Sequence, residues 1–179
     1  MESHASTLKM MQLFAALHMS SIPTEKDWRG GFVERAVARF VFGKRRDELG
    51  LDGEHAYRQF FGKSHEEALE MFRADSLSRQ EDLMEMPLPC FKFYVRAYIE
   101  YLNSDDSIGD TDGSICFFSL VRLRLNEILG LDEPLQNTIF DTVKFLGENP
   151  LRFEAESEIN GSFVDQANKL LANRLQIGG

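Results

Sequence analysis

The chain has 179 residues and a formal net charge of −9, with 43% hydrophobic and 27% charged residues. This composition is typical of a globular protein rather than a disordered one, and the length suits one domain with its own core. No apolar run approaches the roughly 20 residues that cross a bilayer, and the amino-terminal residues lack the basic start of a secretory signal. We therefore expect one soluble domain, residues 1–179, in the cytoplasm and without a membrane partner.

The first half of the chain predicts short helices separated by proline and glycine. Thr24 and Asp27 have the spacing of a capping box, and so do Ser64 and Glu67, while Asp52 can cap a further helix. Apolar residues recur at helical spacing behind these caps. The helices are expected over 4–20, 24–42, 53–61, 64–74 and 78–86.

The second half predicts longer helices around an aspartate-rich loop at 103–113. Asp132 followed by Pro134 is a strong helix start, and Ser162 can cap the last helix. The helices are expected over 89–102, 114–129, 132–146 and 163–176. Residues 151–159 are ambiguous, because apolar and polar residues alternate as in a short strand near 151–157, whereas the spacing of Glu154 and Glu158 also fits a helix. The expected fold is all-α, a single compact bundle of about seven or eight helices.

The cysteines and histidines predict no metal or catalytic site. Cys90 and Cys116 lie among aromatic residues, which favours two free thiols in the core. The four histidines show neither the i, i+4 spacing of a zinc helix nor a nearby cysteine, and His65 is expected in solvent in the first turn of its helix. Nucleophile elbows, phosphate loops and dinucleotide fingerprints are absent from the sequence. We therefore expect no cofactor and lean towards a protein that is not an enzyme.

The aspartate-rich loop resembles part of a calcium-binding loop. Asp110, Asp112 and Gly113 match its third, fifth and sixth positions. The first and twelfth positions, which need carboxylates, are Ile108 and Ser119. The loop is therefore interpreted as an acidic connection with a turn and a helix cap rather than a metal site.

Charge is distributed unevenly along the chain. Residues 26–46 hold seven basic and two acidic residues, whereas residues 100–165 hold fourteen acidic and four basic ones. An acidic surface of this kind suits a basic protein partner and disfavours nucleic acid. The candidate partner-binding residues are Asp105, Asp106, Asp110, Asp112, Glu154, Glu156 and Glu158.

The basic segment has two interpretations. Cations near the end of a helix are favoured by the helix dipole, which explains the segment without any ligand. The alternative is an anion or phosphate site. Its candidate residues are Arg35, Arg39, Lys44, Arg45 and Arg46.

Residues 83–102, Leu-Met-Glu-Met-Pro-Leu-Pro-Cys-Phe-Lys-Phe-Tyr-Val-Arg-Ala-Tyr-Ile-Glu-Tyr-Leu, resemble a pattern in uncharacterised small bacterial proteins. There an apolar pair and a proline precede Phe-x-Tyr-Tyr-x-Pro-Ala and an apolar helix, and an Asp/Ser loop and a segment like 136–146 follow. The resemblance covers residues 80–150 and departs from the pattern at Val95-Arg96, where Pro-Ala would be expected. It implies no activity, but some small acidic helical bacterial proteins of this type resemble immunity proteins of toxin systems.

Three functions remain open from the sequence. The leading hypothesis is a non-enzymatic protein-interaction module, such as an immunity or antitoxin-like inhibitor, that binds a basic partner through its acidic surface. The alternatives are a small-molecule-binding or enzymatic helical domain with a pocket between helices, and a nucleic-acid-associated regulator that uses residues 26–46. Homodimerisation through an apolar helix face is compatible with all three.

Overall fold

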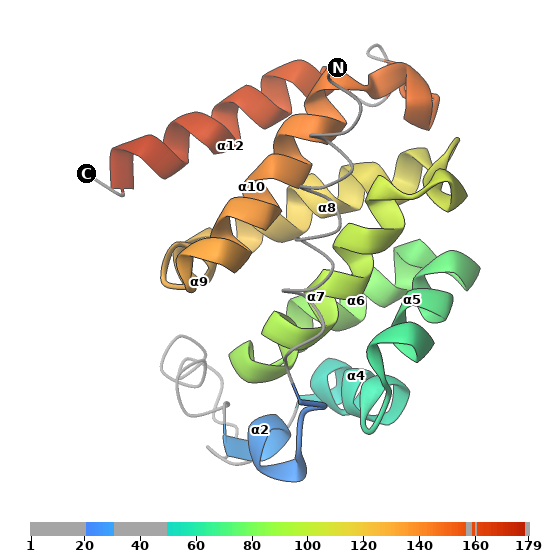
Figure 1. Cartoon of the computed structure of the whole chain (residues 1–179), viewed down its shortest axis with the longest axis vertical. Helices are drawn as coiled ribbons and strands as arrows, with labels where there is room; N and C mark the ends of the chain where they lie inside the picture. Colours follow the sequence, from blue (N-terminus) through green and yellow to red (C-terminus); the bar gives the residue numbers. More distant parts are fainter. Residues whose placement is uncertain (1–20, 31–49, 157–158, 160, 178–179) are drawn as a thin grey trace, which may run out of the picture.

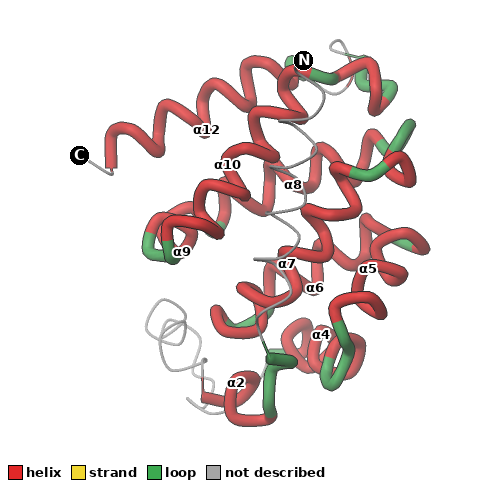
Figure 2. Tube along the Cα trace, in the orientation of Figure 1, coloured by secondary structure: helices red, strands yellow, loops and turns green. Residues whose placement is uncertain are grey.

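The computed structural model describes residues 21–30, 50–156, 159 and 161–177, and these form helices and connections without any strand (Figures 1 and 2). The predicted all-α class is therefore confirmed. Two short 3-10 helices, η2 (Asp105–Ser107) and η3 (Pro150–Phe153), lie in the connections. The α-helices are α2 (Glu25–Gly30), α4 (Leu51–Phe60), α5 (His65–Ala74), α6 (Ser76–Glu85), α7 (Leu88–Asn103), α8 (Thr111–Leu123), α9 (Leu125–Leu129), α10 (Glu133–Glu148) and α12 (Phe163–Ile177).

Helix α7 lies in the middle of the bundle and contacts α2, α5, α6 and α10. Helix α8 packs against α6, α10 and α12, and the pair α10 and α12 forms a second layer on that side. Helices α2 and α4 lie at one end of the molecule, and the connection between α7 and α8 lies towards the other end with η3 (Figure 1). The end that carries α2 and α4 is thus far from the end that carries η3, and one continuous core lies between them.

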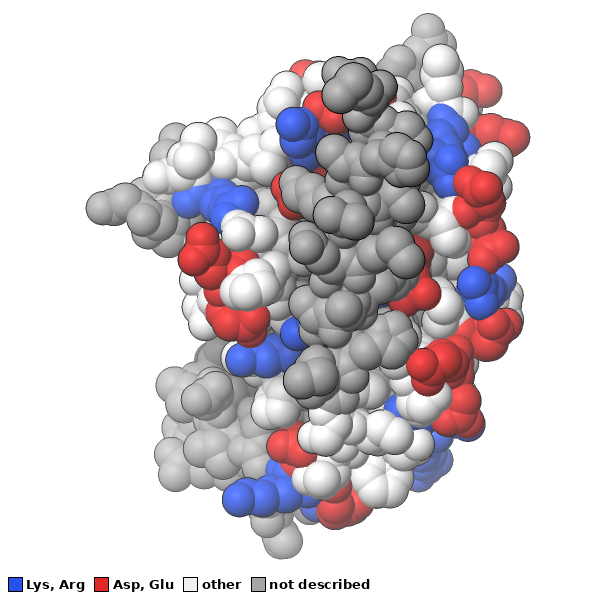
Figure 3. All heavy atoms as spheres, viewed as in Figure 1, with Lys and Arg blue, Asp and Glu red and all other residues white. Residues whose placement is uncertain are grey.

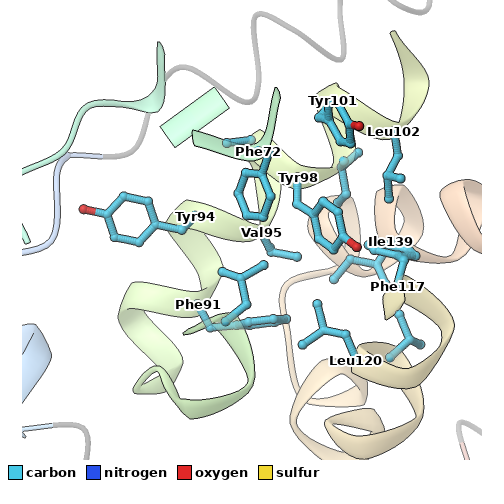
Figure 4. Close-up of a cluster of buried hydrophobic side chains, with 14 of the residues drawn as sticks. Phe72, Phe91, Tyr94, Val95, Tyr98, Tyr101, Leu102, Phe117, Leu120 and Ile139 are labelled. Carbon is cyan, nitrogen blue, oxygen red and sulfur yellow. The ribbon is translucent and has the colours of Figure 1, made fainter. Parts of the chain in front are cut away.

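The core is built around the aromatic face of α7 (Figure 4). Tyr98 is fully buried and stacks on Phe72 of α5, with ring centroids 4.6 Å apart. Its other neighbour is Phe117 of α8, at 5.5 Å and edge to face. The spacing of the apolar residues within 89–102 predicts that they share one helix face, and all members of this face are buried: Phe91, Tyr94, Val95, Tyr98 and Leu102.

Most of the predicted helix caps are present. The backbone N–H and the hydroxyl of Thr24 both donate to Asp27, at 2.8 and 2.7 Å. Ser64 and Glu67 form the predicted capping box. Asp132 and Ser162 accept from backbone amides at the starts of α10 and α12. Local side-chain hydrogen bonds therefore decide these four starts, as the sequence pattern indicates.

Three helices begin two or three residues earlier than predicted. Helix α4 starts at Leu51, so Asp52 lies in its first turn and Gly50 takes the cap position. Helix α6 starts after Asp75, whose side chain accepts from the amide of Ser78. Helix α8 starts after Asp110, which accepts from the amide of Gly113. In the last two cases an aspartate earlier in the chain supplies the cap.

The single helix predicted over 114–129 is wrong, because the chain breaks at Arg124 between α8 and α9. The Arg124 side chain is 2% exposed, and its Nη1 donates to the carbonyls of Leu83 and Met86 at 2.6 and 3.0 Å. Its guanidinium also lies 4.0 Å from the ring centroid of Phe91. A buried cation thus satisfies the carbonyls at the end of α6.

The strand considered near 151–157 is also wrong. The segment starts as η3, Phe153 is buried against Phe145, and Glu154 has a left-handed backbone with φ of 52°. The alternation of apolar and polar residues in this segment therefore does not indicate a strand. It accompanies a tight turn in which one aromatic side chain, Phe153, is buried. In the last helix, Leu175 is 78% exposed.

The remaining sequence predictions concern the two cysteines and the amino-terminal helices. Cys90 is buried as predicted, but Cys116 is only half-buried, and neither forms a disulfide. Burial, with a smaller contribution from Asp112, raises the pKa of Cys116 to about 11. The helix predicted over 4–20 and the part of the second helix beyond Gly30 lie outside the described residues.

Candidate functional site

Two acidic segments that are about forty residues apart in sequence are joined by hydrogen bonds. The backbone N–H of Gly109 donates to the carbonyl of Arg152 at 2.9 Å, and the Thr111 hydroxyl donates to the carbonyl of Phe153 at 2.5 Å. The connection between α7 and α8 is thereby fixed against η3. We call the resulting region the acidic surface, and its carboxylates are Asp105, Asp106, Asp110, Asp112, Glu154 and Glu156.

A shallow hollow of about 370 Å³ lies in this surface. Its acidic lining combines Asp110 and Asp112 from the start of α8 with Glu154 and Glu156 from beyond η3. Four of the residues predicted to bind a partner therefore line one depression. The remaining lining residues are Gly109, Thr111 and Ile159.

Two of the predicted carboxylates are engaged in ion pairs that hold the connection in place. Asp105 pairs with Arg152 at 3.2 Å, and that guanidinium also donates to the carbonyl of Ser104 at 2.6 Å. Asp106 pairs with Arg73 of α5 at 2.7 Å. These arginines neutralise part of the surface and anchor the loop to its neighbours.

Asp110 has a structural role that the sequence pattern only partly predicts. One of its carboxylate oxygens accepts from the amide of Gly113 at 2.9 Å, as a helix cap. The other accepts from the hydroxyls of Ser76 and Tyr101, at 2.6 and 2.7 Å. Burial, reinforced by this hydrogen bond, raises the pKa of Tyr101. Asp110 therefore ties α6, α7 and α8 together at the edge of the hollow.

Replacing Asp110 with alanine is expected to lower the free energy of unfolding by about 2–3 kcal/mol, because it removes a cap and leaves two hydroxyls without their acceptor. Asp112→Ala, two residues further on, is the matched control and should change stability by less than about 0.5 kcal/mol. Urea denaturation of both variants tests this expectation. Equal losses for the two variants would contradict the structural role of Asp110.

Asp112 and Glu154 are the carboxylates that remain available. Both residues are exposed, and neither has a hydrogen-bond or ion-pair partner among the described residues. Glu154 lies next to the connection, since a side chain added at Gly109 would meet its carboxylate at 3.5 Å. Such carboxylates attract the ammonium or guanidinium groups of a partner and hold them at the hollow.

Exposed aliphatic residues accompany the carboxylates. Ile108 is 57% exposed, Leu151 89% and Ile159 77%. Ile159 lines the hollow, and the other two residues adjoin the Gly109–Arg152 hydrogen bond along the chain. None of the three is predicted as a contact residue by the sequence, because Ile108 stands alone in a polar connection and the alternation that includes Leu151 and Ile159 indicates a short strand instead. Their exposure adds an apolar component to the acidic surface.

The acidic surface continues along one edge of the molecule. Acidic side chains interspersed with basic ones follow the edge that carries η3, the connection between α7 and α8, and α5 (Figure 3). Arg73 bridges two parts of this edge, because it pairs with both Glu70 and Asp106.

The described histidines form pairs with carboxylates between helices. His65, predicted to lie in solvent, is 8% exposed, and its Nε2 lies 2.6 Å from Glu100 of α7. His55 of α4 lies 2.8 Å from Asp82 of α6, which is almost fully buried and whose pKa is raised by that burial. The sequence could not predict these pairs, because their members are 35 and 27 residues apart.

The described residues contain no cluster of three or more histidines, cysteines or carboxylates that could hold a metal ion. Within the same ranges, no helix has the length and apolar character needed to cross a bilayer. Glu158 and all the candidate anion-binding residues fall outside the described ranges: Arg35, Arg39, Lys44, Arg45 and Arg46.

Comparison with protein families, curated proteins and solved structures finds no match for this chain.

Proposed function

We propose that this chain is a non-enzymatic protein-interaction module that binds a basic partner through its acidic surface. The observation that supports this most directly is the pair of backbone-mediated hydrogen bonds, Gly109 to Arg152 and Thr111 to Phe153. They unite two separate acidic segments around one hollow. A surface that is assembled in this way presents its carboxylates in a fixed arrangement and limits the ordering required on binding.

The chemistry of the surface indicates the kind of partner. The available carboxylates Asp112 and Glu154 favour lysine and arginine side chains, and complementary charge accelerates encounter and selects against acidic proteins. The exposed Ile108, Leu151 and Ile159 favour an apolar contact beside those charges. The expected partner surface is therefore a basic segment that also carries an aliphatic or aromatic side chain.

The most concrete form of this function is an immunity or antitoxin-like inhibitor in the bacterial cytoplasm. A basic toxin that acts on nucleic acid needs a cationic surface, and an acidic inhibitor can cover that surface. The resemblance of residues 80–150 to small bacterial proteins is compatible with this role.

The proposal is tested by neutralising three acidic residues that line the hollow. A site variant combines Asp112→Asn, Glu154→Gln and Glu156→Gln. A control variant combines Asp52→Asn, Asp141→Asn and Asp165→Asn, which are exposed acidic residues on α4, α10 and α12. Both variants remove three negative charges, so a general effect of net charge influences them equally.

The wild-type protein is crosslinked in a lysate of its native host, the captured protein is identified, and its binding to all three forms is measured by calorimetry. We expect a basic partner whose affinity falls about tenfold or more for the site variant and little for the control. The affinity should also fall as salt is added. Equal affinity for both variants, or no captured protein above background, would refute the proposal.

A further inference from the structure

The pair of His55 and Asp82 uses only one of the two ring nitrogens of the histidine. The His55 side chain on α4 is 58% exposed, whereas the Asp82 side chain on α6 is 3% exposed. Nδ1 of the ring lies 2.8 Å from Oδ1 of Asp82. Nε2 has no hydrogen-bond or ion-pair partner among the described residues. A buried carboxylate therefore holds an exposed imidazole from inside the bundle and leaves Nε2 open to another molecule.

The second oxygen of Asp82 indicates which ring nitrogen carries the hydrogen. Oδ2 pairs with Arg79 of the same helix at 3.0 Å. Burial raises the pKa of Asp82, and the contacts with His55 and Arg79 act against that rise and favour the ionised carboxylate. An ionised carboxylate only accepts hydrogen bonds, so Nδ1 carries the hydrogen and Nε2 of the neutral ring keeps its lone pair.

The same carboxylate favours a reaction at Nε2. When a bond forms at this nitrogen, positive charge develops on the ring, and the carboxylate 2.8 Å from Nδ1 stabilises that charge. The contact also fixes the orientation of the ring, so that Nε2 rather than Nδ1 meets an incoming group. His55 thus has the accessible nitrogen and the orienting partner that a nucleophilic histidine requires.

The surroundings of His55 indicate which group it can take up. In the part of the chain that the structure describes, no set of three potential ligands gathers around it to hold a metal ion. The hollow lies towards the other end of the molecule from α4, so an electrophile must be presented by a separate donor (Figure 1). Arg58, one turn further along α4, is 72% exposed and pairs with Glu54 only loosely, at 3.4 Å. Its guanidinium can turn to an anionic group on the ring, which favours a phosphoryl group.

We propose that Nε2 of His55 is a phosphoryl-acceptor site and that its donor carries a nitrogen–phosphorus bond. The Nε2 lone pair attacks phosphorus, the nitrogen–phosphorus bond of the donor breaks, and its electron pair stays on the nitrogen that leaves as a neutral amine. Nδ1 keeps its hydrogen on Asp82. Because one nitrogen–phosphorus bond replaces another, the transfer is close to energetic balance. This site is separate from the acidic surface and does not depend on the function proposed for that surface.

Labelling of the wild-type chain with potassium phosphoramidate tests the site. Mass spectrometry counts and locates the phosphoryl groups, and phosphorus NMR distinguishes the two ring isomers. We expect the first phosphoryl group on Nε2 of His55. His65 should stay unlabelled, because it is buried and its Nε2 faces Glu100. Labelling at Nδ1 of His55, or label that spreads evenly over the four histidines, would overturn the proposal.

Unfolding of the wild-type chain is a control that needs no substitution. In urea above the unfolding transition, Asp82 no longer holds Nδ1, and every histidine is equally accessible. We therefore expect the preference for His55 over the other histidines to disappear. A preference that persists in the unfolded chain would show that the neighbouring sequence directs the reaction instead of the buried carboxylate, and it would overturn the proposal.

Asp82→Asn tests the carboxylate itself. Arg79 selects the carbonyl oxygen of the new amide, so the NH2 group faces Nδ1 and moves the ring hydrogen to Nε2. We expect the labelling rate of His55 to fall about tenfold or more in the folded variant, with folding checked by circular dichroism. The control Asp141→Asn removes an exposed carboxylate of α10 and should leave the rate unchanged.

Equal labelling rates in the wild type and in folded Asp82→Asn would overturn the role assigned to the carboxylate. If this variant does not fold, the comparison of the folded and unfolded wild-type chain decides the proposal. His55→Gln completes the series, since it should remove the first phosphoryl group without a change in fold. A wild-type level of labelling in His55→Gln would place the acceptor elsewhere.

Discussion

Replacing Arg124 with methionine is expected to lower the free energy of unfolding by about 3–5 kcal/mol, the range found when one member of a buried charged network is removed. The substitution keeps much of the side-chain volume but leaves the carbonyls of Leu83 and Met86 without their donor. It also removes the guanidinium from the face of Phe91 and from the ion pair with Glu127. Urea denaturation monitored by circular dichroism measures the loss.

Arg122→Met is the matched control for this prediction, since Arg122 lies two residues earlier and is exposed. Its hydrogen bond to Ser119 is long, at 3.3 Å, and joins two groups at the surface. We expect a change of less than about 0.5 kcal/mol. A comparable loss in both variants would show that the buried contacts of Arg124 are not the source of the effect.

Replacing Gly147 with alanine is expected to destabilise the protein by about 1–3 kcal/mol through overpacking. A methyl group at this position would lie 2.5 Å from the Cβ of Ala167, where α10 and α12 approach closely. The intrinsic preference of helices for alanine over glycine acts in the opposite direction by about 1 kcal/mol. A lower free energy of unfolding in the variant would therefore show that the two helices cannot separate enough to admit the methyl group. A higher free energy of unfolding would show that they can.

The double variant Gly147→Ala with Ala167→Gly is the direct control, because it moves the methyl group from one helix to the other. It should recover most of the stability that Gly147→Ala loses, and a double-mutant cycle gives the coupling. Gly130→Ala offers a second comparison, since the nearest atom to an added methyl there lies 3.5 Å away. Additive effects at positions 147 and 167 would argue against a close contact between the helices.

Both predictions concern positions that local sequence patterns describe poorly. Arg124 interrupts a run of apolar residues that predicts one continuous helix, and nothing nearby in sequence reveals the carbonyls that it binds. Those carbonyls belong to residues about forty positions earlier. The sequence likewise predicts that Gly147 ends a helix, whereas the structure places it within α10 against α12.

The acidic surface likewise combines features that the sequence predicts with features that depend on tertiary packing. The acidic segments and a cap near the end of the loop were predicted, because residue type and spacing along the chain are sufficient for both. Ser76 and Tyr101 hold Asp110, whereas Asp112 stays exposed. This difference depends on which helices meet at the loop, and the local sequence does not encode it. The exposed Ile108 and Leu151 were missed for a related reason, since exposure is a property of the packed chain.

The sequence by itself determined the all-α class, the buried face of α7 and the helix starts at Thr24, Ser64, Asp132 and Ser162. Each of these depends on interactions within about one helical turn, or on a periodicity that the helix imposes on its own residues. Only the tertiary structure decided the pairs of His65 with Glu100 and of His55 with Asp82, the break at Arg124 and the joining of Gly109 to Arg152. These contacts span 27 to 43 residues of chain, and their partners are selected by the packing of whole helices, which no local spacing encodes.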